Sequence, residues 1–426
     1  MEYLNLHSPI FFRHGWRKYL LATIALSLVM LSASSKAAAG SVAEALTSGK
    51  VYGDIRLRYE SVDQDNPLDD ATALTVRTRL GYSTGSYEGF SALVEFEDSR
   101  IVAGVDDFSV PPIGFNLGSS IIADPETTEI DQGYIQYKNS LVTARVGAQV
   151  IALDNQRFIG HVGWRQDRVT FDAVSATFTP TDKLKITAAY LFERNRLFGE
   201  VLDQESKDNI VNITYPTKIG KLNAYAYLLE DDFGTNISRD TYGLRLAGAR
   251  SLQGTKVNYV VEYADQSLED DAGLDFSMDY IHFELSAAVQ KVRIKVGMES
   301  LGSDAGGQGF FTPLGTVHKF NGFSDQFVLY TPTVGLVDVY VGASRKVGPG
   351  MLSVVYHDFS ADEGTASVDD LGNEINVAYG MKFGKRYNAG IKYAKYEAED
   401  NFRPAGAPPV VSVDTEKVWI WMGLTF

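Results

Sequence analysis

The stretch "VYGDIRLRYE", residues 51–60, alternates apolar and polar side chains with a period of two. Ile55 and Leu57 lie on the face opposite Arg56 and Arg58, as in a β-strand that buries one face. The segments "ATALTVRTRLGY" and "GFSALVEFED", which follow along the chain, repeat this alternation. The sequence therefore predicts an all-β fold.

Strand-like segments of similar length continue to the C-terminus. They cover residues 128–138, 140–149, 169–179, 183–194, 206–216, 221–230, 239–249, 255–265, 275–287, 290–300, 335–346, 350–360, 373–384, 387–397 and 414–426. The total is about eighteen strands of roughly ten residues, the length that a tilted strand needs to cross a bilayer. The stretch "SDQFVLYTPTVG" reads as either strand or loop, and an even number of strands is expected.

The connections alternate between short turns and long polar loops. "KNS", "TPTD" and "FGKR" are short, whereas "SVDQDNPLDDA" and "LFGEVLDQESKD" are long. Outer-membrane barrels show this alternation, because their periplasmic turns are short and their external loops are long. The sequence predicts a single transmembrane antiparallel β-barrel with short periplasmic turns and long extracellular loops. Some loops must fold inward, since wall side chains cannot fill so wide a barrel.

The last strand, "EKVWIWMGLTF", alternates to its end and closes on Phe426. A terminal aromatic residue on such a strand resembles the signal that the barrel-assembly machinery of the outer membrane reads. That machinery is therefore an expected partner, together with outer-membrane lipid. Closure of the sheet pairs the backbone groups that lipid cannot satisfy.

The N-terminus has the pattern of a secretory signal peptide. Arg13, Arg17 and Lys18 precede an apolar run, "YLLATIALSLVML", that is followed by small residues up to Ala39. The run is short for a membrane span, although an N-terminal anchor is the alternative. We expect residues 1–39 to be a cleaved signal peptide, 40–49 a short periplasmic lead and 50–426 the barrel, in the outer membrane of a Gram-negative cell.

The overall charge and the residue types exclude several classes of function. The net charge is −15 and there is no basic tract, so no nucleic acid is expected as a partner. The chain has no cysteine, which excludes disulfides and thiolate sites. The acidic runs "DNPLDDA" and "LEDDAGLD" lack the ligand order of a calcium loop, so we predict no metal and no cofactor. Such runs either bridge to lipopolysaccharide phosphates through divalent cations or stay hydrated.

Charged side chains gather on the face that the strands would turn to the lumen. If the apolar face of each strand meets lipid, both acidic and basic groups line the pore. A pore wall of mixed charge admits small polar solutes, whereas a wall dominated by one sign of charge selects solutes of the opposite charge. The predicted pore-lining cations on the strands are Arg56, Arg58, Arg77, Arg79, Arg145, Arg245, Lys291, Arg293 and Lys295.

One external connection breaks the strand pattern. The stretch "LDNQRFIGHVGWRQDRVTFDA", residues 153–173, carries Phe158 and Trp164 where the other loops are polar. Water disfavours the exposure of such side chains. We expect this loop to fold into the mouth of the barrel, anchored by these two aromatic residues.

Arg157 and Arg165 of this stretch have two possible roles. In a narrow channel of reduced dielectric, a guanidinium binds carboxylates strongly, so both arginines are predicted to line the solute path. In the alternative, they only tie the loop to the wall through carboxylates such as Asp154, Asp167 or Asp172.

A second stretch, "GQGFFTPLGTVHKFNGFSD", also mixes aromatic and basic residues in an external connection. Together the two stretches resemble the "dNqRfiG…gWRq…tfDa" and "TPLgt.H.f.Gf.D.F" signatures of the alginate export family of outer-membrane porins, and "GDIRLRYE" resembles that family's opening strand. The resemblance covers the mature chain. It implies an eighteen-stranded passive pore whose lumen arginines guide a polyanionic uronate. One departure is Gly147-Ala148-Gln149, where the family often has Gly-Arg-Gln.

Three functions compete on this sequence. The first is a channel for anionic oligosaccharides or polysaccharides, or for small carboxylated solutes, and the second is a general diffusion porin. The third is an outer-membrane enzyme, but the four histidines after the leader (His161, His282, His318 and His357) have no nucleophile at a motif spacing. We therefore predict a channel that is not an enzyme.

Overall fold

A computed structural model provides the coordinates of the chain. It describes residues 40–110, 113–231, 237–269, 273–304, 307–328, 330–399 and 412–426. The expected signal peptide, residues 1–39, lies outside the described residues.

Among the described residues, eighteen long strands form one sheet. They are β1 (Lys50–Gln64), β2 (Ala71–Ser83), β3 (Phe90–Asp107), β6 (Thr127–Lys138), β7 (Val142–Gln149), β8 (Thr170–Phe178), β9 (Lys185–Asn195), β10 (Gln204–Thr217), β11 (Gly220–Glu230), β12 (Ser238–Leu252), β13 (Thr255–Glu269), β14 (Asp275–Val289), β15 (Val292–Leu301), β18 (Leu336–Val347), β19 (Gly350–Ser360), β20 (Asp370–Phe383), β21 (Tyr387–Glu397) and β22 (Thr415–Thr425). The shorter elements are β4 (Ser109–Val110), β5 (Gly114–Phe115), β16 (Ser303–Asp304), β17 (Gln308–Gly309), α2 (Val42–Thr47), η1 (Glu200–Leu202) and η2 (Val317–Lys319).

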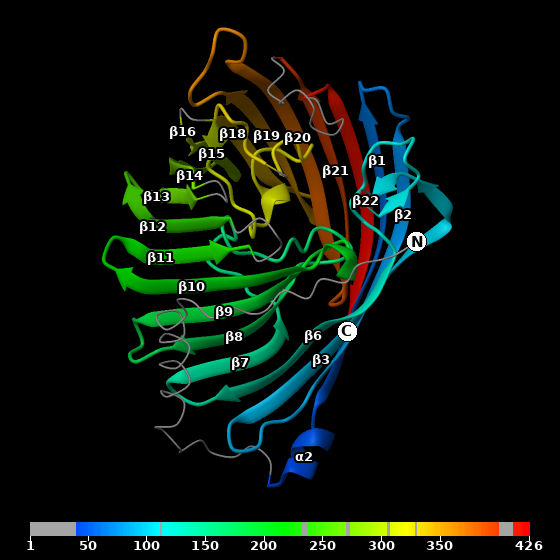
Figure 1. The fold of residues 1–426 in the computed structure, drawn as a ribbon, viewed down its shortest axis with the longest axis vertical. Coiled ribbons are helices and arrows are strands. Elements are labelled where there is room, and N and C mark those ends of the chain that lie inside the picture. The colour runs from blue at the N-terminus through cyan, green and yellow to red at the C-terminus, as the bar shows by residue number, and fades with distance from the viewer. Residues whose placement is uncertain are drawn as a thin grey trace, which may run out of the picture.

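The sheet closes into an antiparallel barrel. Each long strand pairs with the next one along the chain, and β1 pairs with β22, from Asp54 opposite Thr425 to Gln64 opposite Thr415. Figure 1 shows blue β1 and red β22 side by side, where the first and last strands of the sheet meet. The predicted closed barrel and its even strand number are confirmed, and the ambiguous stretch 324–335 is a loop in its described part.

The two faces of the wall differ as the alternation predicts. Leu57, Phe96 and Ile420 are exposed on the outside of the barrel. Arg58 and Trp419, at positions of opposite parity, are buried on the inside. Period-two patterning therefore gives an apolar outer surface and a largely polar inner wall.

The two ends of the barrel are also unlike. One carries tight turns, and the helix α2, capped by the Ser41 hydroxyl that accepts from the Glu44 N–H at 3.2 Å, lies at this end. This helix falls in the lead 40–49. None of the described helices is long and apolar enough to cross a membrane.

The other end carries the long connections. In the described part of the chain, three of them fold into the barrel. We call residues 150–169, between β7 and β8, the first inward loop. The second inward loop is the described part of residues 307–335, which contains β17 and η2 and ends at β18. The third is the 108–126 connection, which packs Phe108 and Ile122 against Val62 on the inner face of β1. The interior is thus filled from the long-loop end.

Candidate functional site

The two inward loops are joined to each other by backbone hydrogen bonds. The Gly160 N–H donates to the Leu314 carbonyl at 2.7 Å, and the Thr316 N–H donates to the Gln156 carbonyl at 2.8 Å. The Thr316 hydroxyl accepts from the His161 N–H at 3.1 Å. The loops therefore form one unit across the lumen and satisfy the backbone groups that irregular segments would otherwise leave unpaired.

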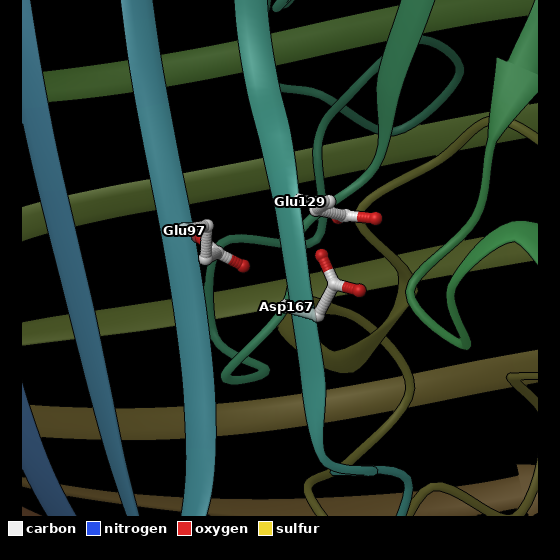
Figure 2. A group of neighbouring side chains, drawn as sticks. All are labelled: Glu97, Glu129 and Asp167. Carbon is white, nitrogen blue, oxygen red and sulfur yellow. The ribbon is translucent and has the colours of Figure 1, made fainter.

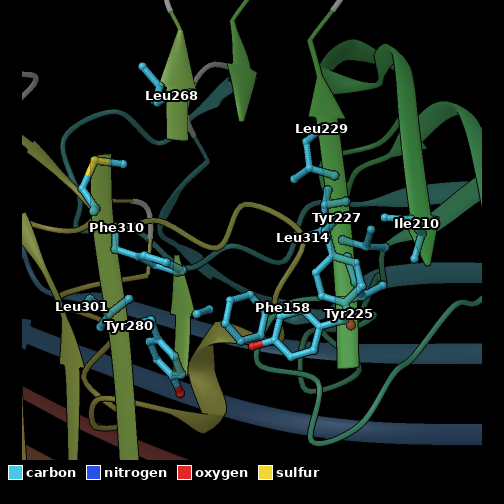
Figure 3. Packing of buried hydrophobic residues seen from close by; sticks show 14 of the residues in the cluster. Phe158, Ile210, Tyr225, Tyr227, Leu229, Leu268, Tyr280, Leu301, Phe310 and Leu314 are labelled. Atoms are coloured by element: carbon cyan, nitrogen blue, oxygen red, sulfur yellow. The ribbon is translucent and has the colours of Figure 1, made fainter. Parts of the chain in front are cut away.

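The apolar side of this unit packs against the inner wall. The Phe158 ring lies 5.1 Å from that of Tyr225 on β11, 5.2 Å from Tyr280 on β14 and 5.9 Å from Phe310 of the second inward loop. Figure 3 shows the ring between its two tyrosine neighbours. Burying such a side chain stabilises the docked loop by about 2 kcal/mol. Phe158 thus lies where the sequence predicts an anchor.

Arg157 joins the first inward loop to the wall and to the second loop. Its Nε lies 2.9 Å from Oε1 of Glu299 on β15, and its Nη2 donates to Oδ1 of Asn321 at 3.0 Å. The guanidinium also lies 4.9 Å from the Phe320 ring centroid. Only 2% of Arg157 is exposed.

Arg165 makes a second junction of the same kind. Its Nη1 donates to both carboxylate oxygens of Glu60 on β1 at 3.0 Å, and its Nη2 donates to Oδ2 of Asp325 in the second loop at 2.9 Å. Burial acts to lower the pKa of Arg165, but Glu60 and Asp325 outweigh it and raise that pKa. With 7% exposed, the side chain is held charged.

The structure thus pairs both loop arginines with carboxylates, which is the kind of contact that the second of the two roles requires. The carboxylates are Glu299, Glu60 and Asp325 rather than the nearby residues that the sequence offered. Each partner lies more than a hundred positions away in the sequence, so inspection of neighbouring residues could not find it.

The predicted wall arginines of β1 hold the first inward loop by its backbone. Arg56 donates to the carbonyls of Gly163, Trp164 and Arg165 at 3.3, 2.7 and 2.5 Å. Arg58 donates to the Trp164 carbonyl and pairs with Glu60 at 3.5 Å. These two side chains lie on the predicted inner face but are occupied by the loop.

Four other wall arginines also have protein partners. Arg77 pairs with Asp54 and Arg79 with Glu97, while Arg245 lies 3.1 Å from Glu262. Arg145 donates to Gln136 at 2.9 Å and stacks on Tyr134. Lys291 lies in the turn between β14 and β15 and is exposed there, outside both strands, because β15 begins two residues later than expected.

A cavity of about 470 Å³ lies beside the two loops. Four cationic side chains line it, Arg293 and Lys295 from β15, Lys319 from η2 and Lys392 from β21. Among the described lining residues there is no Asp or Glu. The remaining lining residues are Trp164, Thr316, His318, Gly322, Phe323, Gly342, Ala343, Ser344, Ser353, Val354, Val355, His357 and Asn376.

Flat rings form one side of this cavity. Trp164, the second predicted anchor, stacks on His318 at 5.1 Å with 3° between the ring planes. Lys392 Nζ lies 3.7 Å from the Trp164 ring centroid and 4.1 Å from that of Phe323. It also lies 3.2 Å from His318 Nε2. The cavity therefore combines positive charge with apolar ring faces.

The sequence indicates the members of this group but not that they meet. Lys319 and His318 lie in the second aromatic and basic stretch, which is the signal that could have marked them. Lys392 has the parity of the inner face, but its contact with Trp164 joins strands and loops far apart in the sequence. Only the folded barrel brings these groups together.

The profile of the family described as alginate export matches residues 48–268, more than half of the chain. No curated protein matches the sequence.

Solved structures of similar fold cover most of the chain. OccK9 (OpdG) of Pseudomonas aeruginosa has a TM-score of 0.68 and 13% identity over 90% of this chain and 99% of its own. OccAB1 of Acinetobacter baumannii has a TM-score of 0.67 and 11% identity over 92% and 99%. OpdK of Pseudomonas aeruginosa, solved with vanillate, has a TM-score of 0.65 and 11% identity over 88% and 98%. At these identities the likeness shows the fold.

Proposed function

The chain belongs to the alginate export family and is an outer-membrane porin, and we propose that it admits small solutes that carry a carboxylate on a ring, such as single or paired uronic acids. The alternative, a general diffusion porin, predicts no marked preference between anions and other small solutes.

The observation that carries the proposal is the charge of the cavity beside the inward loops. Arg293, Lys295, Lys319 and Lys392 line it, and none of its described lining residues is acidic. One cation changes the energy of an anion 4 Å away by about 1 kcal/mol even at the dielectric constant of bulk water. Four of them favour anions over cations in this part of the lumen.

The rings in the lining support a cyclic solute. Trp164 and Phe323 both flank Lys392, so a ring could lie against an apolar face while its carboxylate meets the ammonium group. The solved structure of OpdK, similar in fold, holds vanillate. A cavity of about 470 Å³ is of the size that holds a small ligand, which favours short solutes over a long polymer.

This proposal divides the predicted site residues into two groups. Arg293 and Lys295 contact the solute, together with Lys319 and Lys392. Arg157 and Arg165 keep the two loops in place, since their guanidinium groups are already paired. Selectivity would then depend on the loop arginines only through the shape that they maintain.

Reversal potentials in planar bilayers across a salt gradient test this function. We expect the parent channel to prefer anions, and the Lys295→Gln and Lys392→Gln variants to lose about fivefold in the ratio of anion to cation permeability, which corresponds to about 1 kcal/mol for each charge. Lys291→Gln is the matched control, because Lys291 is exposed in a turn near Lys295 and does not line the cavity.

Two results would support the general diffusion porin instead. One is a parent reversal potential near zero. The other is an equal response of Lys295→Gln and Lys291→Gln. Block of single-channel current by a uronic acid, but not by the neutral sugar of the same ring size, would favour the carboxylate proposal.

A further inference from the structure

Three carboxylates meet where the first inward loop touches the wall. Glu97 on β3 and Glu129 on β6 lie directly opposite each other in the sheet register. Asp167 reaches them from the loop, and one oxygen from each of the three lies within 4.8 Å of the others. Figure 2 shows the three side chains close together. Like charges in opposed positions of a sheet repel, so this arrangement needs a compensating partner.

Asp167 is held in this position by its two neighbours. The Gln166 N–H donates to Asp124 at 2.8 Å, and the Gln166 side chain donates to the Thr75 hydroxyl at 2.7 Å. Arg168 lies 2.5 Å from Asp131. Because both flanking residues are held by these contacts, the backbone of Asp167 stays beside the two glutamates.

The side chain of Asp167 is buried without a donor. Its exposed fraction is 0%, and neither of its carboxylate oxygens accepts a hydrogen bond from an N–H or hydroxyl group of the described residues. Oε1 of Glu97 is also buried and accepts no hydrogen bond from an N–H or hydroxyl group of the described residues. A buried carboxylate without a donor is strongly disfavoured, so a cation at this point would remove an electrostatic penalty of the docked loop.

The cations nearby do not balance the charge. Arg79 pairs with the other oxygen of Glu97, and Arg168 pairs with Glu95 and Asp131. Five carboxylates therefore share two guanidinium groups in this part of the lumen: Glu95, Glu97, Glu129, Asp131 and Asp167. The excess is three negative charges if all are ionised.

We propose that Glu97, Glu129 and Asp167 bind a calcium ion that fastens the first inward loop to strands β3 and β6. All donors are carboxylate oxygens, which hard divalent cations prefer. Oxygens within 4.8 Å of one another fit around one ion, since Ca–O bonds are about 2.3–2.6 Å long and calcium accepts irregular geometry. Glu129 is only half-buried, so water can complete the coordination.

The site would act on the pore through the loop that it fastens. Asp167 lies two residues after Arg165 and three after Trp164. Arg165 pairs with Asp325 of the second loop, and Trp164 lines the cavity. Loss of the ion would leave mutually repelling carboxylates at the base of the loop. Calcium would therefore determine whether the constriction stays docked.

Calcium titration of the purified barrel, refolded in detergent without lipopolysaccharide and stripped with EDTA, tests the proposal. We expect calorimetry to show one calcium ion bound per barrel, and the ion to raise the thermal unfolding temperature. Asp167→Asn and Glu129→Gln should each weaken binding at least about tenfold and lose the calcium-dependent shift. Without calcium, Asp167→Asn should be as stable as the parent or more stable, because it removes repulsion.

Glu262→Gln is the matched control. Glu262 is a buried lumen carboxylate paired with Arg245 on strands far from the cluster, and its loss should leave calcium binding unchanged. The proposal is overturned if the parent binds no calcium, or if Asp167→Asn binds it as the parent does. If lower pH stabilises the parent but calcium does not, the three carboxylates share a proton and do not bind an ion. That result would also overturn the proposal.

Discussion

Arg165 of the first inward loop forms an ion pair with Asp325 of the second, with 2.9 Å between Nη2 and Oδ2. The same guanidinium donates to Glu60 on β1. One buried side chain thus joins the wall and both loops. Removing one member of a buried ion pair typically costs about 3–5 kcal/mol, because its partners keep uncompensated charge.

Replacing Arg165 with Gln should therefore undock the loops. We expect a higher and noisier single-channel conductance and faster cleavage of residues 150–169 by protease, with little change in the ratio of anion to cation permeability. Arg145→Gln is the control, since the contacts of Arg145 are with Gln136 and Tyr134 of the wall. A change in permeability ratio at parental conductance would show that Arg165 faces the solute path.

Gly160 provides a steric test of the contact between the loops. A Cβ atom added there would lie 2.2 Å from the Thr316 hydroxyl oxygen, closer than atoms can approach. Gly160→Ala should therefore push the loops apart, at a cost of about 1–3 kcal/mol for overpacking, and raise protease cleavage of both.

Gly118→Ala is the control for that substitution. The nearest atom to a Cβ at Gly118 is 3.8 Å away, an ordinary contact, in a different inward connection. Equal protease resistance of the two alanine variants would mean that the close approach of Gly160 and Thr316 does not hold the loops together.

Docking of the second inward loop should also depend on pH, because of His318. Burial, and then the charges of Lys392 and Arg165, lower the pKa of His318 to about 4 in spite of Asp325, whereas it is about 6.5 in an unfolded chain. The undocked loop therefore binds more protons between these values, and docking weakens as the pH falls from about 6.5 to about 4.

Asp325 should cause a second loss of loop docking, at lower pH. Burial opposes ionisation of Asp325, but His318, Lys417 and Arg165 hold its pKa well below the usual range. The stabilisation of the docked loop by ionised Asp325 is fully present above the unfolded pKa of about 3.9 and is lost progressively as the pH falls below that value. Single-channel recordings from pH 7 to pH 3 should show both steps.

His318→Phe separates the two steps. It keeps a ring against Trp164 and removes the titrating nitrogen, so we expect the step between pH 6.5 and 4 to disappear while the acidic step remains. Persistence of the first step in this variant would assign it to another group.

The barrel was predictable because its signal is local. Alternation along ten residues is enough to recognise a strand such as β1, and the lengths of successive connections are enough to orient the barrel. A helix in the lead was missed, although Ser41 and Glu44 have the spacing of a capping box. The inward folding of residues 153–173 was also predictable, because Phe158 and Trp164 are poor residues for a solvated loop.

The partners in the lumen were not predictable from one sequence. Arg157 meets Asn321 and Arg165 meets Glu60 only after the sheet has closed and two loops have entered it. Glu97 and Glu129 become neighbours through strand register, which cannot be read without knowing the length of the connection between their strands. Proximity along the chain suggested Asp167 as a partner for arginine, and the fold gives it carboxylate neighbours instead.

Phe426 closes the barrel in the structure and is also the residue that we expect the assembly machinery to read. Its N–H donates to the Gly53 carbonyl at 3.0 Å, and its carbonyl accepts from the Gly53 N–H at 3.1 Å. Those bonds use the backbone, so Phe426→Ala keeps them. We therefore expect this variant to refold in detergent like the parent, but to reach the outer membrane of cells in a severalfold smaller folded fraction, measured by heat-modifiable mobility on gels.

Met422→Ala is the matched control, because Met422 lies on the same outer face of β22 and is as exposed as Phe426. It removes apolar surface from the same strand without touching the terminal residue. If both variants assemble alike in cells, the terminal ring carries no assembly signal. If Phe426→Ala fails to refold even in detergent, the ring is needed for closure itself, through its packing over Gly53, where an added Cβ would lie 2.3 Å from the ring.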